Sequence, residues 1–252
     1  MELGLAGRRA LITGASSGLG LSTAIALASE GAEVMLVARS PERLTAASTA
    51  LSERVAGARV HVGTADVSDA DQVQEIANFA IETMGGVDIL IANAGGPPPG
   101  GFASTPLEAY LPALQLNLLS TVAMCNALVP GMCSAGWGRV VAITSITVRE
   151  PNPNLILSNT ARAGLTGFLR TLAREVAGNG VTVNSVQPGL HRTGRLEALY
   201  DDVESLGSTV PTGSIGDPDD FGRVATFLCS DSARFITGAA IPVDGGASHG
   251  LQ

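Results

Sequence analysis

Two serines and an arginine stand at a suggestive spacing in the middle of the chain. Ser145 comes directly after an apolar run that ends in Ile143-Thr144, and Ser158 follows thirteen residues later. Arg162 is four residues beyond Ser158, so both side chains share one face of a helix expected to begin at about Asn154. Two hydroxyls and a fixed positive charge can hold a substrate oxygen, but none of the three titrates in the neutral range. The spacing therefore predicts a polar site that lacks an obvious general acid.

A glycine-rich segment, TGASSGLG at residues 13–20, follows the first apolar run and opens a helical pattern. Gly14 permits a tight turn, Gly18 lets a pyrophosphate approach the backbone, and Gly20 lets the helix pack on the sheet. The start of the helix adds free N–H groups and the positive end of its dipole. We predict a dinucleotide phosphate site here, with Ser16, Ser17 and Leu19 in the same loop; a plain tight turn is the alternative.

The end of the next apolar run bears on the choice of cofactor. An NAD site places an acid there to bind the 2′-hydroxyl of the ribose. This chain has Ala38, followed by Arg39, which can make a bidentate contact with a 2′-phosphate. The pair favours NADP(H) over NAD(H), the alternative being a surface arginine at the end of a strand.

The elements that must position these residues follow from hydrophobic patterning. Short apolar runs occur at 8–13, 34–37, 59–63, 87–92, 139–144, 181–187 and 240–243. Helical patterns lie between them at 18–31, 41–55, 69–84, 107–133, 154–177 and 218–230. The alternation predicts an α/β fold: one Rossmann-type domain over 1–252, doubly wound, whose parallel seven-stranded sheet carries helices on both faces. Residues 190–216 break the pattern and are expected to form an irregular, mobile flap over the site.

The composition of the chain excludes several classes of binding partner and of chemistry. The net charge of −8 argues against a nucleic-acid partner, because phosphate contact needs a basic face. All fifteen basic residues are arginine, which excludes lysine Schiff-base chemistry and a P-loop lysine. No apolar run approaches the length of a membrane span and no signal peptide is recognised, so we expect a cytoplasmic protein without a membrane partner. The three cysteines and three histidines form no metal-binding pattern, so no metal is expected.

Together these motifs resemble the short-chain dehydrogenase/reductase family, in the family's order and over nearly the whole chain. TGASSGLG is similar to its TGxxxGxG, IANAG at 91–95 to its NAG motif, and VNSVQPG at 183–189 to the strand and PG turn beside the nicotinamide. The resemblance implies a homotetramer or, failing that, a dimer. It implies that the cofactor contacts Asp66, Val67, Asn93, Ala94, Gly95, Pro188, Gly189 and Thr193. It also implies that Asn117 and Ser145 belong to the catalytic group.

The resemblance breaks at Ser158 and Arg162. There the family has the tyrosine and lysine of a YxxxK motif, whose tyrosine passes a proton to or from the substrate oxygen. A serine hydroxyl is a far weaker acid than a phenol, while Arg162 keeps a charge that can hold the nicotinamide ribose. The alternative is that Ser158 caps a helical turn, Arg162 anchors it, and catalysis is lost.

Other residues near Ser158 are candidates for proton transfer or for substrate contact. His191 follows the PG turn and has a suitable pKa range, although its ring could point to solvent. Tyr200 lies in the flap and could swing inward, and Thr147 could line the substrate pocket. A water molecule could also complete the proton path.

These observations predict an NADP(H)-dependent oxidoreductase that acts on a small carbonyl or alcohol substrate, similar to 3-oxoacyl reductases, with an atypical active site. Two alternatives stay open. One is a family member with non-redox chemistry, such as dehydration or isomerisation. The other is a nucleotide-binding pseudoenzyme that acts as a sensor or partner subunit.

Overall fold

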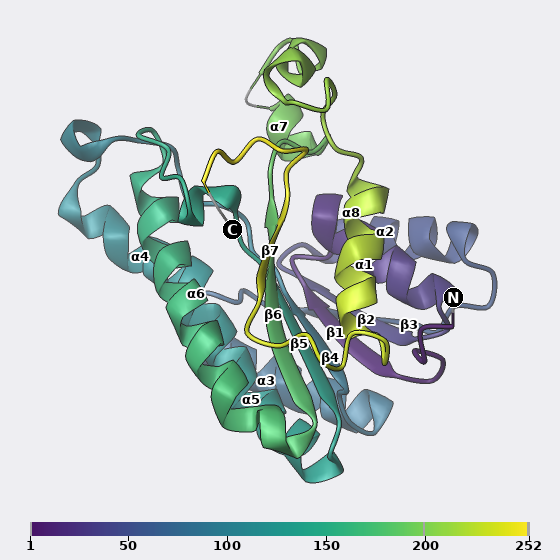
Figure 1. Ribbon diagram of the computed structural model, residues 1–252. Coiled ribbons are helices and arrows are strands. Elements are labelled where there is room, and N and C mark those ends of the chain that lie inside the picture. The colour runs from purple at the N-terminus through teal and green to yellow at the C-terminus, as the bar shows by residue number, and fades with distance from the viewer. Residues whose placement is uncertain (1, 199, 251–252) are drawn as a thin grey trace.

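The computed structural model describes residues 2–198 and 200–250, which build on a single parallel sheet (Figure 1). Its strands are β1 (Arg9–Thr13), β2 (Glu33–Ala38), β3 (Val60–Thr64), β4 (Ile89–Ala92), β5 (Gly138–Ile143), β6 (Val181–Pro188) and β7 (Ala240–Val243). The seven strands run in the order β3-β2-β1-β4-β5-β6-β7, and every neighbouring pair is parallel. The chain order reverses between β1 and β4, which is where ligands bind in open α/β sheets.

Helices cover both faces of the sheet. One face carries α1 (Gly18–Ser29), α2 (Pro41–Arg54) and α8 (Pro218–Cys229), and the other carries α3 (Ala70–Met84), α5 (Ser120–Ala135) and α6 (Ile156–Val176). Successive side chains of β1 alternate between two hydrophobic cores, since Leu11 packs with α3, α5 and α6 whereas Ile12 packs with α1, α2 and α8. The predicted doubly wound Rossmann-type fold is confirmed.

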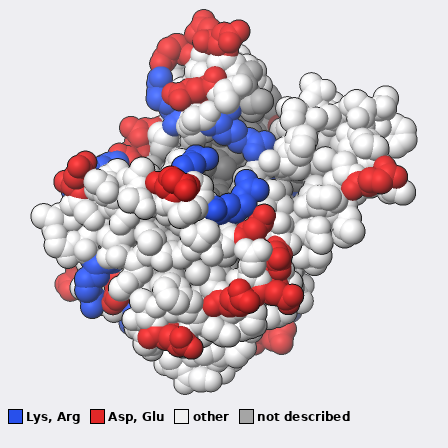
Figure 2. All heavy atoms as spheres, turned by 180° about the vertical axis from the view of Figure 1, so that it is seen from behind, with Lys and Arg blue, Asp and Glu red and all other residues white. Residues whose placement is uncertain are grey.

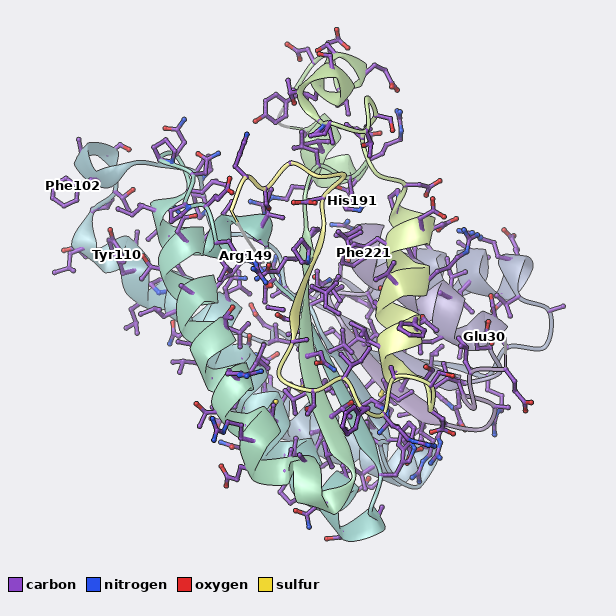
Figure 3. The ribbon with its side chains drawn as sticks, in the orientation of Figure 1. Glu30, Phe102, Tyr110, Arg149, His191 and Phe221 are labelled. Carbon is purple, nitrogen blue, oxygen red and sulfur yellow. The ribbon has the colours of Figure 1, made fainter. Side chains whose placement is uncertain are left out.

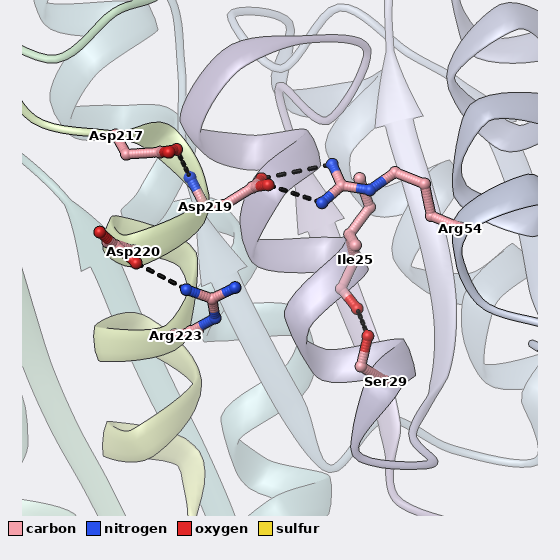
Figure 4. Close-up of polar contacts among 7 residues, drawn as sticks. All are labelled: Ile25, Ser29, Arg54, Asp217, Asp219, Asp220 and Arg223. Carbon is pink, nitrogen blue, oxygen red and sulfur yellow. Dashed lines mark hydrogen bonds and ion pairs between the residues drawn. The ribbon is translucent and has the colours of Figure 1, made fainter.

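An ion pair connects α2 and α8, two of the helices on the face of the sheet that also carries α1. Arg54 at the end of α2 forms a two-pronged contact with Asp219 at the start of α8, with Nη2 2.6 Å from Oδ2 (Figure 4). Asp217 caps the same turn of α8 by accepting from the backbone N–H of Asp219 at 2.8 Å. This layer holds α1, whose N-terminus faces the predicted phosphate site.

The long helix predicted over 107–133 is not uniform. It consists of a 3-10 turn (Leu107–Ala109), α4 (Tyr110–Leu114), a π-helical segment (Gln115–Leu119) and α5. A π segment inserts one extra residue per turn and is common at functional sites, and here it contains Asn117. The predicted long helix is confirmed as one helical run over Leu107–Ala135, but its hydrogen-bond spacing changes along the way, and the π segment was not predicted.

The same segment corrects the statement that no apolar run approaches a membrane span. Leu107–Ala135 covers 29 residues with a mean hydropathy of 1.5, long and apolar enough to cross a membrane by length and composition. A core helix of a globular protein passes the same test. Met124, Leu128 and Met132 of α5 are buried in the core against the sheet, and 39% of the apolar window is buried in all.

The segment 190–216 is less irregular than predicted. It contains α7 (Gly194–Glu197) and a 3-10 helix (Glu204–Thr209), and its two ends are joined where His191 bridges Gly216. The backbone N–H of Arg192 donates to Gly216 O at 2.9 Å. The closed loop rises beyond the carboxyl ends of the strands in Figure 1, as a flap over the site requires. Its mobility stays a prediction.

Candidate functional site

The glycine loop between β1 and α1 leaves no room for side chains. Gly14 and Gly18 adopt left-handed backbone conformations, with φ of 58° and 56°. A Cβ at Gly14 would lie 2.7 Å from the side-chain nitrogen of Asn93, and one at Gly20 would lie 2.5 Å from Gly14 O. Ser17 stands at the N-cap of α1 without a side-chain capping bond. The loop thus presents bare backbone and a helix N-terminus, which suits a phosphate group.

Hydrogen bonds from β4 fix this loop. Thr13 Oγ1 donates to Asn93 O at 2.7 Å and accepts from the backbone N–H of Asn93 at 2.9 Å. The side chain of Asn93 donates to Gly14 O at 3.1 Å. The glycine loop and the residues Asn93, Ala94 and Gly95 are therefore brought together, as the resemblance implied.

One cavity, of about 420 Å³, opens beside the end of β2. The predicted residues Gly14, Ser16, Ser17, Arg39, Asp66, Val67, Asn93, Ala94 and Gly95 all line it. Arg39 is 74% exposed and its Nη1 lies 3.9 Å from Asp66 Oδ2. Burial raises the pKa of Asp66, but hydrogen bonds from Ser68 and the nearby Arg39 outweigh it, so the pKa is lowered and the group is ionised at neutral pH.

The same cavity holds an arginine that sequence reasoning missed. Arg43, in the first turn of α2, donates from Nη2 to Ser17 Oγ at 3.1 Å across the cavity mouth. The sequence did contain a signal for Arg43. Ser40 caps α2, so Arg43 lies in the first turn of that helix, four residues after Arg39. In Figure 2, arginine side chains gather around a hollow on the face seen from behind.

A second cavity, of about 340 Å³, adjoins the first and reaches Ser145, Ser158 and Arg162. Gly18, Leu19, Ser145, Ser158, Arg162, Pro188, Gly189, His191 and Thr193 all line it, together with the shared residues Gly14, Ser17 and Asn93–Gly96. No aspartate or glutamate stands among its lining residues within the described chain. The cavity therefore favours uncharged or anionic occupants.

Ser145 is oriented by its neighbour Thr147. Its Oγ accepts from the backbone N–H of Thr147 at 3.1 Å and lies 2.9 Å from Thr147 Oγ1. Thr147 is buried and does not line either cavity, so it acts on Ser145 and not directly on a ligand. If Thr147 donates to Ser145, the hydroxyl hydrogen of Ser145 is free to point into the cavity.

Ser158 and Arg162 lie on the same face of α6, and both are buried. Arg162 donates to Ile143 O at 2.9 Å and to Ala94 O at 3.4 Å, so among the described residues carbonyl groups, and no carboxylate, hold it. Burial, reinforced by the charge of Arg195, lowers the pKa of Arg162 to about 10. The guanidinium thus remains charged at neutral pH.

Asn117 reaches the site from the π segment. Its Nδ2 donates to Gly95 O at 2.8 Å, whereas its Oδ1 is buried with no partner among the described residues. Asn117 lines neither cavity, so it meets the site through Gly95, and its buried unpartnered acceptor is suited to a bound water.

His191 is buried, so the expectation that its ring could point to solvent was wrong. The ring packs edge-on against Phe221 of α8, with centroids 5.1 Å apart (Figure 3). Its Nδ1 lies 3.3 Å from Gly189 O, and burial lowers its pKa, so the ring is neutral at neutral pH. No hydrogen bond joins it to Ser145 or Ser158 in the described structure. Tyr200 is 47% exposed and lines neither cavity.

Thr193 and Arg195 belong to the flap. Thr193 caps α7 by accepting from the backbone N–H of Leu196 at 3.4 Å, and it lines the second cavity. Arg195 was not predicted; it lines that cavity and donates to Pro97 O at 3.3 Å. Nothing in the family motifs pointed to it.

A continuous groove thus runs from two arginines, past a glycine loop at a helix N-terminus, to two serines and a buried arginine. The bare backbone and the cations fit a phosphorylated dinucleotide, so the fold and the site define a nucleotide-binding protein of the Rossmann type. A family model described as enoyl-(acyl carrier protein) reductase matches residues 14–248. The chain belongs to the short-chain dehydrogenase/reductase family.

Relatives cover nearly the whole chain. The 3-oxoacyl-[acyl-carrier-protein] reductase of Aquifex aeolicus is 31% identical, over 98% of this chain and 99% of its own. The L-sorbose reductase of Gluconobacter frateurii, solved with NADPH and L-sorbose, has a TM-score of 0.94 and is 32% identical over 100% of both chains. An NADPH-bound short-chain oxidoreductase of Pseudomonas aeruginosa with an atypical catalytic centre is 34% identical, with a TM-score of 0.91 over 97% of this chain and 98% of that one.

Proposed function

We propose that this protein is an NADP(H)-dependent oxidoreductase that transfers hydride between the nicotinamide and a small carbonyl or alcohol substrate, in the manner of a 3-oxoacyl reductase. The observation that carries the proposal is the continuity of the two cavities along the glycine loop. A dinucleotide laid in the groove places its adenosine end at Arg39 and Arg43 and its nicotinamide end at Ser145 and Ser158. The NADPH complexes of the sorbose and Pseudomonas relatives support the choice of cofactor.

At the adenosine end, the absence of an acid at position 38 removes the partner that a free 2′-hydroxyl needs. Arg39 and Arg43 instead offer two guanidinium groups to a 2′-phosphate. Ser68 occupies Oδ1 of Asp66, and Arg39 lies 3.9 Å from its Oδ2, so the nearest carboxylate in this cavity is already paired in part with the cation proposed to bind the 2′-phosphate.

At the nicotinamide end, the bound cofactor would supply the hydride and the protein must supply a place for the substrate oxygen. Ser145 donates to that oxygen, and in this arrangement Thr147 Oγ1 donates to Ser145 Oγ, which lies 2.9 Å away. Arg162 stays protonated and stabilises the negative charge that develops there. Ser158 holds a water that relays a proton taken up from solvent, because neither the serine nor the arginine replaces the tyrosine and lysine of the family as an acid.

The test is NADPH oxidation over one panel of ketones and 3-oxoacyl thioesters. The wild type should turn over slowly, because a well-placed general acid is worth roughly 10²- to 10⁴-fold. The paired change Ser158→Tyr with Arg162→Lys should raise that rate, and Ser158→Ala should lower it only modestly. Fast wild-type turnover that collapses in Ser158→Ala, without a pH dependence pointing to another group, would show that the serine itself carries the proton.

A second candidate is a nucleotide-binding pseudoenzyme. It is favoured by one observation: His191, the titratable ring nearest the site, packs against Phe221 and is not bonded to Ser145 or Ser158. Tight NADPH binding without turnover on any substrate in the panel, and without gain in the double variant, would support this candidate over the first.

A further inference from the structure

The flap lines the second cavity with Thr193, Gly194, Arg195 and Leu196, and two of these residues reach opposite walls. On one side, Thr193 faces the glycine loop, since a Cβ at Gly18 would lie 3.4 Å from Thr193 Cγ2. On the other side, the guanidinium of Arg195 lies against Gly96, where its central carbon would be 2.5 Å from an added Cβ. Arg195 also donates to Pro97 O at 3.3 Å. The segment 193–195 therefore spans the groove as a strap.

The strap touches a residue that both cavities share, because Arg195 lies against Gly96. Gly14, Ser17 and Asn93–Gly96 line both cavities, and none of them carries a charge. A dinucleotide that fills both cavities places its diphosphate along this shared wall, at the N-terminus of α1. The charges within the groove otherwise stand at its ends, with Arg39, Arg43 and Asp66 at one and Arg162 at the other.

Arg195 brings a positive charge to this uncharged stretch. Its charge is close enough to Arg162 to lower the pKa of that group. Its partner within the described structure is a neutral carbonyl, Pro97 O, at the long end of hydrogen-bonding distance. A guanidinium fork binds paired phosphate oxygens more strongly than it binds a single carbonyl.

We propose that Arg195 is a diphosphate-binding residue: its guanidinium leaves Pro97 O and closes the strap 193–195 over the diphosphate of a bound dinucleotide. The proposal rests on the cofactor class given above but not on hydride transfer. Because NADPH and NADH share the diphosphate, Arg195 strengthens the binding of both. This distinguishes it from Arg39 and Arg43, which act on the 2′-phosphate alone.

The flap supplies a matched control. Arg192 lies three residues before Arg195, forms an ion pair with Glu204, and lines neither cavity. Arg192→Gln removes the same charge from the same segment without touching the groove. Arg195→Lys keeps a charge at the strap, whereas Arg195→Gln keeps the length of the side chain and removes the charge.

The experiment is a fluorescence titration of NADPH, NADH and adenosine 2′-phosphate, which has no diphosphate, with stopped-flow dissociation rates for both dinucleotides. Arg195→Gln should raise the Kd of NADPH and of NADH by about tenfold each, mostly through faster dissociation, since one charge-assisted contact is worth roughly that factor. The Kd of adenosine 2′-phosphate should not change. Arg195→Lys should recover most of the loss, and Arg192→Gln should bind like the wild type.

Three results overturn the proposal. The first is an unchanged Kd for both dinucleotides in Arg195→Gln, including the case in which only the KM of an anionic substrate rises. The second is a loss confined to NADPH, which assigns Arg195 to the 2′-phosphate. The third is a wild type that binds no dinucleotide, which overturns the proposed function as well. A wild type that binds both dinucleotides but reduces no carbonyl, with the expected losses in Arg195→Gln, overturns only the proposed function.

Discussion

The choice between NADPH and NADH is expected to depend on two arginines that share one cavity. Arg43 reaches across the cavity mouth to Ser17 Oγ at 3.1 Å, and Arg39 stands 3.9 Å from Asp66. A hydrogen bond to a charged group is worth roughly 1.5–3 kcal/mol, and solvent around these exposed side chains reduces that to about 1 kcal/mol each. We therefore expect Arg39→Ala and Arg43→Ala each to weaken NADPH about fivefold, with NADH changed less than twofold.

The assay is a titration of both cofactors at two salt concentrations, because exposed ionic contacts weaken as salt screens them. Arg223→Ala is the control: Arg223 is an equally exposed arginine that pairs with Asp220 on α8, outside both cavities. Its NADPH affinity should match the wild type. The reasoning fails if the two variants lose NADPH and NADH to the same extent, or if the wild type binds both cofactors equally well.

Two further predictions concern stability and assembly. Asp88, at the start of β4, accepts two side-chain contacts from Arg9 at 2.7 and 2.8 Å; burial raises its pKa, but the bonds from Arg9 outweigh this and lower it. Because the pKa of Asp88 is lower in the folded than in the unfolded protein, its ionised form adds to the free energy of unfolding. This contribution is complete above the unfolded pKa of about 3.9 and is lost as pH falls below that value. Asp88→Asn should thus lower Tm at pH 7 by about 4 °C, for a loss of roughly 1–2 kcal/mol, and the gap from wild type should narrow progressively as pH falls below about 3.9. A gap in calorimetry that stays constant on acidification would refute this. We also propose a homotetramer, or failing that a dimer, built on the helices α5 and α6; a monomer at micromolar concentration in light scattering would contradict it.

The fold was predictable because the signals that define it are local and repeated. Apolar runs such as Leu11-Ile12 and Val140–Ile143 are buried on both faces, as a parallel sheet requires, and glycine-bounded helices lie between them. The π segment around Asn117 was not predictable in the same way. A shift in hydrogen-bond spacing leaves no mark on hydrophobic periodicity, so the sequence read as one continuous helix.

The backbone of the site could be predicted from the sequence better than the orientation of its side chains. Gly14, Gly18 and Gly20 stand where the backbone conformation or a close neighbour admits only glycine. A glycine in the sequence is itself a sign of such a position. The orientation of His191 depends instead on Phe221 and Gly216, which are 30 and 25 residues away in the chain. Arg195 is visible as a groove residue only once the flap is folded back toward Pro97.

In the proposed function, serine at position 158 has a second effect besides the lack of a phenol to act as an acid. A phenol ring fills space, so a serine in its place leaves room between Ser145, Ser158 and Arg162, at the end of a cavity without carboxylates. Arg162 in that space is held by the carbonyl oxygens of Ile143 and Ala94, which satisfy its hydrogen bonds without neutralising its charge. A positive charge buried without a counter-ion raises the affinity of the pocket for electron-rich oxygens, whether of a water or of the substrate. In the proposed function, the serine that stands where the family has its tyrosine thus leaves space for a water as the proton carrier, and the paired change to tyrosine and lysine tests whether a phenol in that space works faster.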